Sequence, residues 1–301
     1  MRQSMNTYKL IANPHAGGGR AARTITEMVR ILNARNVRHD LEVTREQHDA
    51  EAIAARACAD PAVTAIVSIG GDGTLNEIVQ GAVLSGKPLA VVPAGSGNDF
   101  SKMLKMPKNL DAVVDVVLAG RTRVIDAGRI NNRYFINGVG FGFDAAVNYN
   151  TRSVRWITSG FAVYVLAFLK TLNKYRPSHM TVRINGETIE RELFLVSVGN
   201  GTTCGGGFKL TPHAKFDDNL LDITMVTPLG LVQLFRHLPK VFQGTIDTTG
   251  HAITRRSPLL TVESPHQLPV QVDGEIFSLE GNTCEISVVP RGLTVIGKFE
   301  D

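Results

Sequence analysis

The chain has 301 residues, of which 43% are hydrophobic and 20% are charged, a composition typical of a soluble globular protein with one large or two medium domains. The net charge of +4 favours acidic partners, but no alternation of aromatic and basic residues suited to stacking bases is present, so nucleic acid is not expected. The longest apolar run, residues 161–169, is too short to cross a bilayer, and no leader pattern opens the chain, so we expect a cytoplasmic protein.

Strands and helices are expected to alternate up to about residue 125. An apolar run at 8–12 reads as a first strand, and apolar residues at helical spacing follow in 21–33. Residues 49–59 repeat the helical spacing with alanines. Such alternation predicts a doubly wound α/β domain with a parallel sheet.

A glycine-rich loop at residues 70–74 lies between the apolar run 63–69 and a helical pattern that starts at Leu75. Glycines at 70, 71 and 73 leave room for phosphate groups near the backbone, and the helix behind them presents free N–H groups and a positive dipole end. Asp72 would repel a phosphate unless a magnesium ion or ordered water lay between them. We therefore expect a metal-bound nucleotide here, although a lone loop of this kind also fits an ordinary turn.

Two further loops follow strands in the same way. The run 89–93 leads into residues 94–100, and the first strand leads into residues 13–20, which include glycines 17–19. The three loops should converge at the carboxyl edge of the sheet, where open α/β sheets bind ligands. Neither the Walker pattern nor the dinucleotide pattern occurs at these positions, so a standard P-loop or Rossmann site is excluded.

Beyond Asp126 the pattern changes to short β-like runs separated by turns, which predicts an antiparallel β-sandwich-like domain. A helix is expected near 155–175, and its apolar face lies between basic residues and beside Trp156. This segment could lie on a membrane surface or simply pack in the core, and the sequence leaves both open. The three cysteines are scattered, which suits reduced thiols and offers no metal-ligand spacing. The basic residues are Arg152, Arg155, Lys170, Lys174 and Arg176, and the cysteines are Cys58, Cys204 and Cys284.

The Asp273-Gly274 pair lies between two β-like runs, 268–272 and 276–279. Asp-Gly between such runs is a strong hairpin signal, so the residues alone favour a plain turn.

Taken in order, the motifs resemble the diacylglycerol kinase catalytic domain, in the form that the bacterial soluble lipid kinases use. The resemblance spans nearly the whole chain and implies a nucleotide-binding domain over 1–125 that the returning segment 291–301 joins. It also implies a β-rich lipid-substrate domain over 126–290, with the active site in the cleft between the domains. The motifs that carry it are Asn13-Pro14, Gly70 to Glu77, Pro93 to Phe100, Gly138 to Ala145, Gly205 to Gly207, Pro212 to Asp218 and Val272 to Glu275.

The resemblance implies an ATP-dependent and Mg²⁺-dependent kinase that phosphorylates the hydroxyl of diacylglycerol or another long-chain lipid. Asp273 is then the general base for that hydroxyl, with Glu275 beside it, and Asp72 and Asp99 face the magnesium and its waters. Asp99 could instead cap the helix that follows it. The residues implied in nucleotide binding are Asn13, Gly70, Gly71, Asp72, Gly73, Thr74, Glu77, Gly95, Ser96, Asn98 and Asp99.

A second, structural magnesium loop is implied at residues 215–220, with the Asp218 carboxylate and the carbonyls of Lys215 and Leu220 as ligands. Asn219 stands where the family has glycine, and Ser96 where it has threonine. Asparagine tolerates left-handed angles, so the loop should form and hold the metal, and a solvated acidic turn is the alternative.

Two other functions are compatible with parts of the sequence. An NAD kinase shares the loop at 70–74, but the loop at 95–99 and the turn at 273–275 fit lipid kinases better. A non-catalytic nucleotide or lipid sensor would lack the base or a metal carboxylate, and this chain has both. Peripheral contact with anionic membranes is expected, whereas the lipid acceptor, the choice of ATP over GTP and the oligomeric state, a homodimer included, stay open.

Overall fold

The computed structural model describes residues 7–154, 161–172, 174–205, 207–278 and 281–299. The contact pattern divides the chain into two compact units. Unit 1 comprises Met1–Ala127 and Pro290–Asp301, and unit 2 comprises Gly128–Val289.

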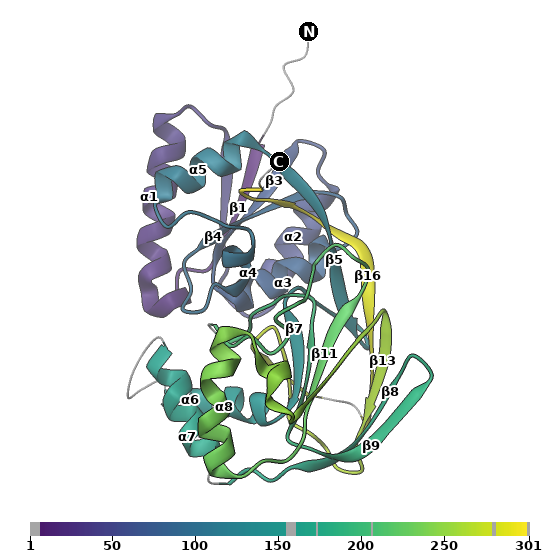
Figure 1. The fold of residues 1–301 in the computed structure, drawn as a ribbon. Helices are drawn as coiled ribbons and strands as arrows, with labels where there is room; N and C mark the ends of the chain where they lie inside the picture. Colours follow the sequence, from purple (N-terminus) through teal and green to yellow (C-terminus); the bar gives the residue numbers. More distant parts are fainter. Residues whose placement is uncertain (1–6, 155–160, 173, 206, 279–280, 300–301) are drawn as a thin grey trace. The chain divides into compact units, whose positions relative to one another are not determined.

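Unit 1 is built on a parallel sheet (Figure 1). Its strands are short apolar runs, and the central ones are buried on both faces, as parallel strands covered by helices must be. The last strand to join it comes from the end of the chain, where Thr294 and Val295 pair with Pro88 and Leu89. In spatial order the strands are β2 (His39–Val43), β1 (Thr7–Ala12), β3 (Val63–Gly70), β4 (Pro88–Pro93) and the end of β16 (Thr283–Ile296).

Helices flank this sheet because each buries one apolar stripe against it. Two of them, α1 (Arg20–Ala34) and α5 (Leu110–Ala119), share a hydrophobic cluster with alternate residues of β1, β3 and β4. Helices α2 (Asp49–Ala59) and α3 (Asp72–Ala82) pack against each other. The predicted helices at 21–33 and 49–59 are thus confirmed, the second to the residue.

Unit 2 contains a six-stranded antiparallel sheet. Its strands β10 and β11 alternate between two environments, since Val196 and Val198 face one cluster while Leu195 faces another. Both faces of the sheet are therefore covered. The strands lie in the order β12 (Ala252–Ser257), β11 (Leu221–Val226), β10 (Leu195–Gly199), β7 (Gly138–Gly142), β14 (Val270–Val272) and β15 (Glu275–Phe277).

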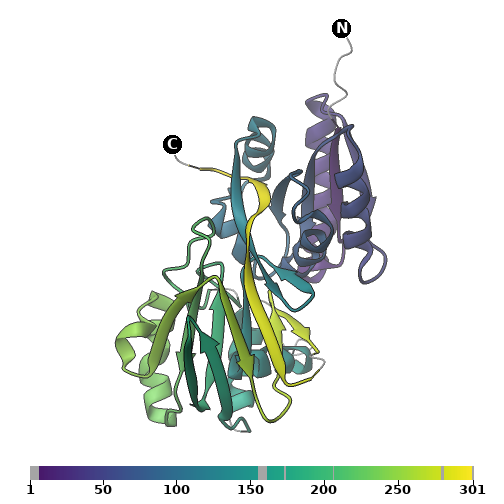
Figure 2. The ribbon, with the colours of Figure 1, turned by 90° about the vertical axis from the view of Figure 1, so that its right-hand side faces the viewer.

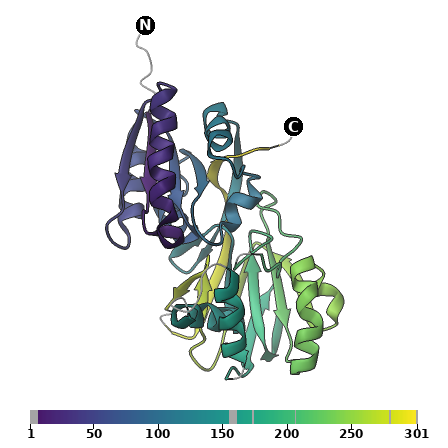
Figure 3. The ribbon, with the colours of Figure 1, turned by 90° about the vertical axis from the view of Figure 1, so that its left-hand side faces the viewer.

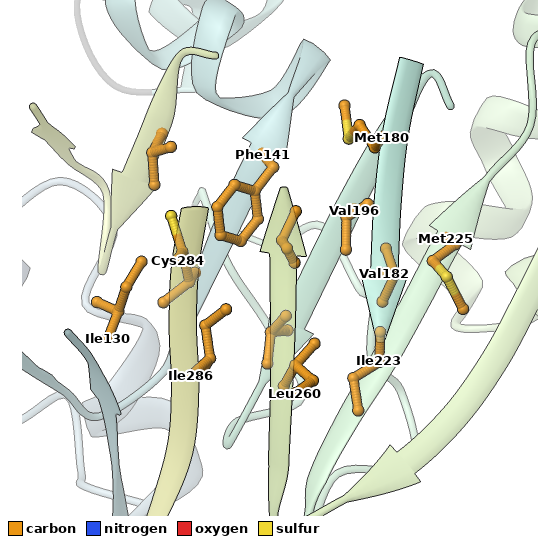
Figure 4. Close-up of a cluster of buried hydrophobic side chains, with 14 of the residues drawn as sticks. Ile130, Phe141, Met180, Val182, Val196, Ile223, Met225, Leu260, Cys284 and Ile286 are labelled. Atoms are coloured by element: carbon orange, nitrogen blue, oxygen red, sulfur yellow. The ribbon is translucent and has the colours of Figure 1, made fainter. Parts of the chain in front are cut away.

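A second layer of strands covers one face of this sheet and gives unit 2 its sandwich (Figure 2). Phe141 and Val196 from the six-stranded sheet share one core with Val182, Leu260 and Ile286 from the second layer (Figure 4). Strand β16 pairs with β13 (Leu259–Glu263), β13 with β8 (Ser178–Ile184) and β8 with β9 (Glu187–Leu193), while β5 (Thr122–Ile130) pairs with β6 (Arg133–Phe135).

Three helices cover the other face: α6 (Phe143–Val154), α7 (Phe161–Leu172) and α8 (Leu231–Gln243). A cluster of aromatic side chains packs beneath these helices. In it, Phe143 stacks on Phe194 with ring centroids 4.4 Å apart and contacts Phe168 edge-on.

The expected α/β fold with a β-sandwich-like second part is confirmed. Helix α7 covers part of the helix expected near 155–175, and residues 155–160 lie outside the described chain. Helices α6 and α8 were not expected. Among the described residues, no helix combines the length and apolar character that crossing a membrane requires.

Candidate phosphoryl-transfer site

Three glycine-rich loops leave the carboxyl ends of β1, β3 and β4, which are parallel neighbours in unit 1. Backbone hydrogen bonds link the first and third loops to the end of β3, the strand between them: Asn13 N–H donates to Ile69 O at 3.0 Å, and Ala94 N–H donates to Gly70 O at 3.0 Å. The predicted convergence of the loops is therefore observed.

The loops lie too close together for side chains at several glycines. A Cβ atom on Gly95 would lie 2.4 Å from the Cα atom of Gly71, and one on Gly17 would lie 2.3 Å from the carbonyl oxygen of Ala94. Gly17 also has a φ of +62°, which favours glycine. The glycines thus serve contact between the loops, in addition to any contact with a ligand.

Asp72, at the start of α3, has a structural role that sequence reasoning missed. Its Oδ2 atom accepts the N–H of Asn98 at 2.8 Å, and Oδ1 accepts the N–H of Asp99 at 3.0 Å. These are the first amides of α4 (Asp99–Met103), so Asp72 caps that helix and balances its dipole. Two amide donors therefore offset part of the negative charge that Asp72 brings to the glycine-rich loop.

Asp99 lies beside Asp72 and is 4% exposed. Lys102 donates to Asp99 Oδ1 at 2.9 Å, and a Cβ atom on Gly97 would lie 2.6 Å from Asp72 Oδ2 and 3.7 Å from Asp99 Oδ2. Asp99 does not cap its own helix, where Asn98 holds the capping position. Asp72 Oδ2 and Asp99 Oδ2 thus lie on the same side of Gly97, and Lys102 pairs with the other oxygen of Asp99. Two carboxylate oxygens placed in this way are donors of the kind that a hydrated Mg²⁺ ion contacts through its waters.

The other predicted nucleotide residues lie around these loops. Asn98 closes its own loop, since its amide accepts Gly95 N–H and donates to Gly95 O, both at 2.9 Å. Ser96 is exposed, Thr74 is buried beneath Gly70, and Glu77 is half-buried on α3. Asn13 Oδ1 accepts the N–H of His15 at 3.0 Å, so it orders the first loop.

Two further residues of unit 1 were missed from the sequence. Arg20 bridges the first and third loops, because Nε donates to Gly17 O at 3.0 Å and Nη2 donates to Gly95 O at 3.2 Å. Asp126 on β5 is buried and accepts the N–H of Arg291 at 2.8 Å. The Arg20–Gly95 and Arg291–Asp126 contacts each join distant parts of the chain. Arg20 follows three glycines directly, which could have drawn attention to it, whereas the sequence around Asp126 gave no such signal.

The Asp273-Gly274 pair forms the predicted hairpin turn between β14 and β15, with φ values of +50° and +84°. Positive φ at both residues is the mark of a type I′ turn, which Asp-Gly favours. Glu275 follows at the start of β15 and is exposed.

The Asp273 carboxylate is buried and faces a row of backbone amides in unit 2. Oδ1 accepts the N–H groups of Asn137 at 2.8 Å and Gly138 at 2.9 Å, and Oδ2 accepts that of Ile136 at 2.8 Å. Asp273 N–H donates in turn to Gly138 O at 2.9 Å. The side chain thus clamps the segment leading into β7, a role that the turn reading did not include.

The backbone of Gly274 is held from two sides. Its N–H donates to Gln271 Oε1 at 2.7 Å, and its carbonyl accepts Asn148 Nδ2 at 2.5 Å. Gln271 Nε2 also lies 3.4 Å from Asp144 Oδ2 in the first turn of α6. Burial raises the pKa of Asp144 to about 7, although Ala145 N–H and Gln271 partly offset that effect.

In the predicted metal loop at 215–220, the carboxylate of Asp218 pairs with an arginine. The Asp218 carboxylate accepts a hydrogen bond from Arg256 and the N–H of Leu220, while Lys215 is exposed. Arg256 also donates to Asp222 at 3.3 Å. A guanidinium that already neutralises Asp218 occupies the place of a cation, so these residues do not fit a bound metal as they stand. Asn219 does take the expected positive φ, +60°.

The expected membrane segment is described in part. Arg155 and Trp156 lie outside the described residues, as does the side chain of Arg152. Lys170, Lys174 and Arg176 are exposed.

Comparison with known proteins agrees with the geometry. A family model for the diacylglycerol kinase catalytic domain matches residues 7–130, and one for the YegS C-terminal NAD kinase beta sandwich-like domain matches residues 137–297. A diacylglycerol kinase from Mycobacterium tuberculosis is 33% identical over 98% of this chain and 96% of its own length. A second, from Staphylococcus aureus, is 29% identical over 89% of this chain and 85% of its own.

The fold has a counterpart among solved structures. A crystal structure of a diacylglycerol kinase from Bacillus anthracis superposes with a TM-score of 0.80 at 25% identity, covering 98% of this chain and 97% of that one. Family models that cover both units and relatives matched over almost their full length lead to one conclusion: the chain belongs to the diacylglycerol kinase family of lipid kinases.

Proposed function

We propose that this lipid kinase transfers the γ-phosphate of ATP, as its magnesium complex, to the hydroxyl of diacylglycerol or a related long-chain lipid. The observation that carries the proposal is the set of three interlocked glycine loops, with Asp72 and Asp99 at their centre, in a chain of this family.

Phosphoryl transfer needs positioning and charge neutralisation more than covalent help. In this proposal the backbone amides of the loops at 70–74 and 95–98 hold the phosphates, and exposed Ser96 adds a hydroxyl. Asp72 and Asp99 hold the magnesium ion through their oxygens or its waters, and the ion supplies charge neutralisation at the γ-phosphate. Because Asp72 is already fixed by two amides of α4, metal binding requires little reorganisation of that carboxylate.

We assign Asp273 as the group that receives the proton of the lipid hydroxyl. Its three amide donors favour the charged carboxylate, which is the form that can accept a proton. The transition state of phosphoryl transfer is loose, so the hydroxyl becomes acidic only as its oxygen bonds to phosphorus, and the proton moves late.

The test is transfer of labelled phosphate from ATP to a total lipid extract, followed by identification of the labelled product. Diacylglycerol and NAD are then supplied singly as acceptors, with and without a chelator, and labelled GTP replaces labelled ATP to test the choice of donor. Label in phosphatidic acid that needs Mg²⁺ supports the proposal. Label that enters NAD and no lipid would support the NAD kinase alternative. If neither NAD nor any lipid is labelled, the result would favour the non-catalytic nucleotide sensor.

We further propose that the enzyme is cytoplasmic and meets its lipid by reversible contact with the anionic membrane surface, since the acceptor resides in the bilayer and the chain carries a net charge of +4.

A further inference from the structure

Helix α8 exposes a stripe of large apolar side chains. Leu231, Val232 and Phe235 are 59%, 83% and 49% exposed. Their spacing places them on one side of the helix, while Leu234 and Leu238 pack into the core of unit 2. A monomeric surface does not gather such residues without a reason, because each leaves apolar area in water.

Helix α7 repeats the arrangement at the same spacing. Val165, Leu166 and Leu169 are 40%, 36% and 47% exposed. The two helices contact each other where Phe168 meets Phe235, with ring centroids 6.5 Å apart, and both are seen in Figure 3. The apolar stripes therefore belong to one pair of contacting helices in unit 2.

The charges on these helices have one sign. Neither aspartate nor glutamate occurs in residues 145–186 or 223–246. Both stripes are followed by exposed cations: Lys170 and Lys174 after Leu169, and Arg236 after Phe235. Apolar side chains with flanking cations and no acid are the pattern of an interfacial helix on anionic lipid.

We propose that this pair of stripes, Val165, Leu166 and Leu169 of α7 with Leu231, Val232 and Phe235 of α8, docks on an anionic phospholipid surface. The proposal rests on the proposed function, because it names the surface through which the kinase meets its lipid. A second copy of the chain fits less well, since a symmetric contact would bring the same cations together.

The test uses the double variant Leu231→Ser/Val232→Ser, chosen because both side chains are largely exposed and their loss should leave the fold intact. The matched control is Leu84→Ser/Leu259→Ser, which removes two leucines that are 64% and 50% exposed elsewhere. Co-sedimentation is measured with vesicles of phosphatidylglycerol and of phosphatidylcholine.

We expect the wild type and the control to bind phosphatidylglycerol, and the α8 variant to bind it about tenfold more weakly, the effect of removing two apolar anchors. Arg236→Glu should also weaken binding, and high salt should reduce what remains. Equal binding by the α8 variant and the control would overturn the proposal. So would self-association in lipid-free buffer, seen by sedimentation velocity, that the α8 substitutions abolish.

Vesicle binding needs no turnover, so it tests this surface even if the kinase proposal fails. If the kinase proposal holds, the α8 variant should phosphorylate a short-chain, water-soluble diacylglycerol at the wild-type rate and lose activity only on vesicles. Loss on both substrates would also count against a docking role.

Discussion

The carboxylate of Asp273 accepts the backbone N–H of Asn137 at 2.8 Å, so the side chain assigned as the base also holds the segment that enters β7. Because of this contact, the substitution Asp273→Asn is expected to affect the stability of the protein as well as its turnover. Asn-Gly makes as good a hairpin as Asp-Gly, but asparagine would turn an NH₂ group toward an amide that needs an acceptor.

We therefore expect Asp273→Asn to lower the free energy of unfolding by about 1–3 kcal/mol and to reduce turnover by roughly two to four orders of magnitude. The control is Asn148→Ala, which removes the bond to Gly274 O but keeps the carboxylate, and should lose stability while retaining most turnover. Thermal melting and phosphorylation, both measured well below the melting temperature of each variant, separate the two effects. A folded Asp273→Asn protein with full turnover would rule out the base.

The contact between Gly95 and Gly71 gives a test of the proposed nucleotide site. Gly95→Ala places a carbon 2.4 Å from the Gly71 Cα, which must push the second and third loops apart. We expect the Kd for Mg·ATP to rise at least about tenfold, a loss of 1.4 kcal/mol or more in binding. Gly230→Ala serves as the control, because its Cβ atom would lie 3.8 Å from Gln233 Oε1, an ordinary contact distance. Titration calorimetry that gives wild-type affinity for Gly95→Ala would show that the loops do not hold the nucleotide.

Asp144 gives a pH dependence with a definite sign. Its pKa is raised by burial from 3.8 to about 7, so in the folded protein it keeps its proton over a range in which the unfolded chain has lost it. The contribution of Asp144 to the free energy of unfolding is therefore complete below the pKa of its carboxyl in the unfolded chain. As the pH rises toward about 7, the free energy of unfolding falls by up to about 4 kcal/mol.

Asp144→Asn should remove this dependence. We expect the variant to gain stability relative to the wild type as the pH rises from 4 to 7, and the difference to level off above 7. Urea unfolding at a series of pH values measures the difference directly. A difference that does not change with pH would mean that Asp144 is charged in the folded state.

Arg256 provides the test of the loop at 215–220. Because its guanidinium pairs with both Asp218 and Asp222, we expect chelation of divalent cations to leave the melting temperature of the nucleotide-free protein unchanged. Arg256→Met should lower the stability by about 1 kcal/mol, since these side chains are only partly buried. A fall in the wild-type melting temperature on chelation, abolished by Asp218→Asn, would instead restore a metal to this loop.

Local patterns predicted much of this fold. The apolar runs before glycines became β1, β3 and β4, and Asp-Gly became the turn at 273–274 with the φ values that the pair favours. These features depend on neighbours in the chain, which a sequence displays directly.

The rest depended on tertiary contacts. Helix α8 was not predicted, and it contains Pro239, a residue type that usually marks a helix end. The cap that Asp72 provides for α4, the bridge of Arg20 and the pairing of Arg256 all join residues far apart in sequence. No residue pattern specifies such partners before the strands are set in register. The loops of the candidate site could therefore be predicted from the sequence, but the side-chain contacts between them could not.

The route of β16 sets the order in which the chain can fold on the ribosome. Unit 1 lacks one of its strands until Thr294 and Val295 reach β4, and all of unit 2 is synthesised in between. The glycine loops at the carboxyl ends of β3 and β4 therefore belong to an incomplete sheet during translation, with an exposed edge on β4. Nascent chains stalled before residue 290 should be sensitive to proteolysis in unit 1, and release of the last segment should protect it.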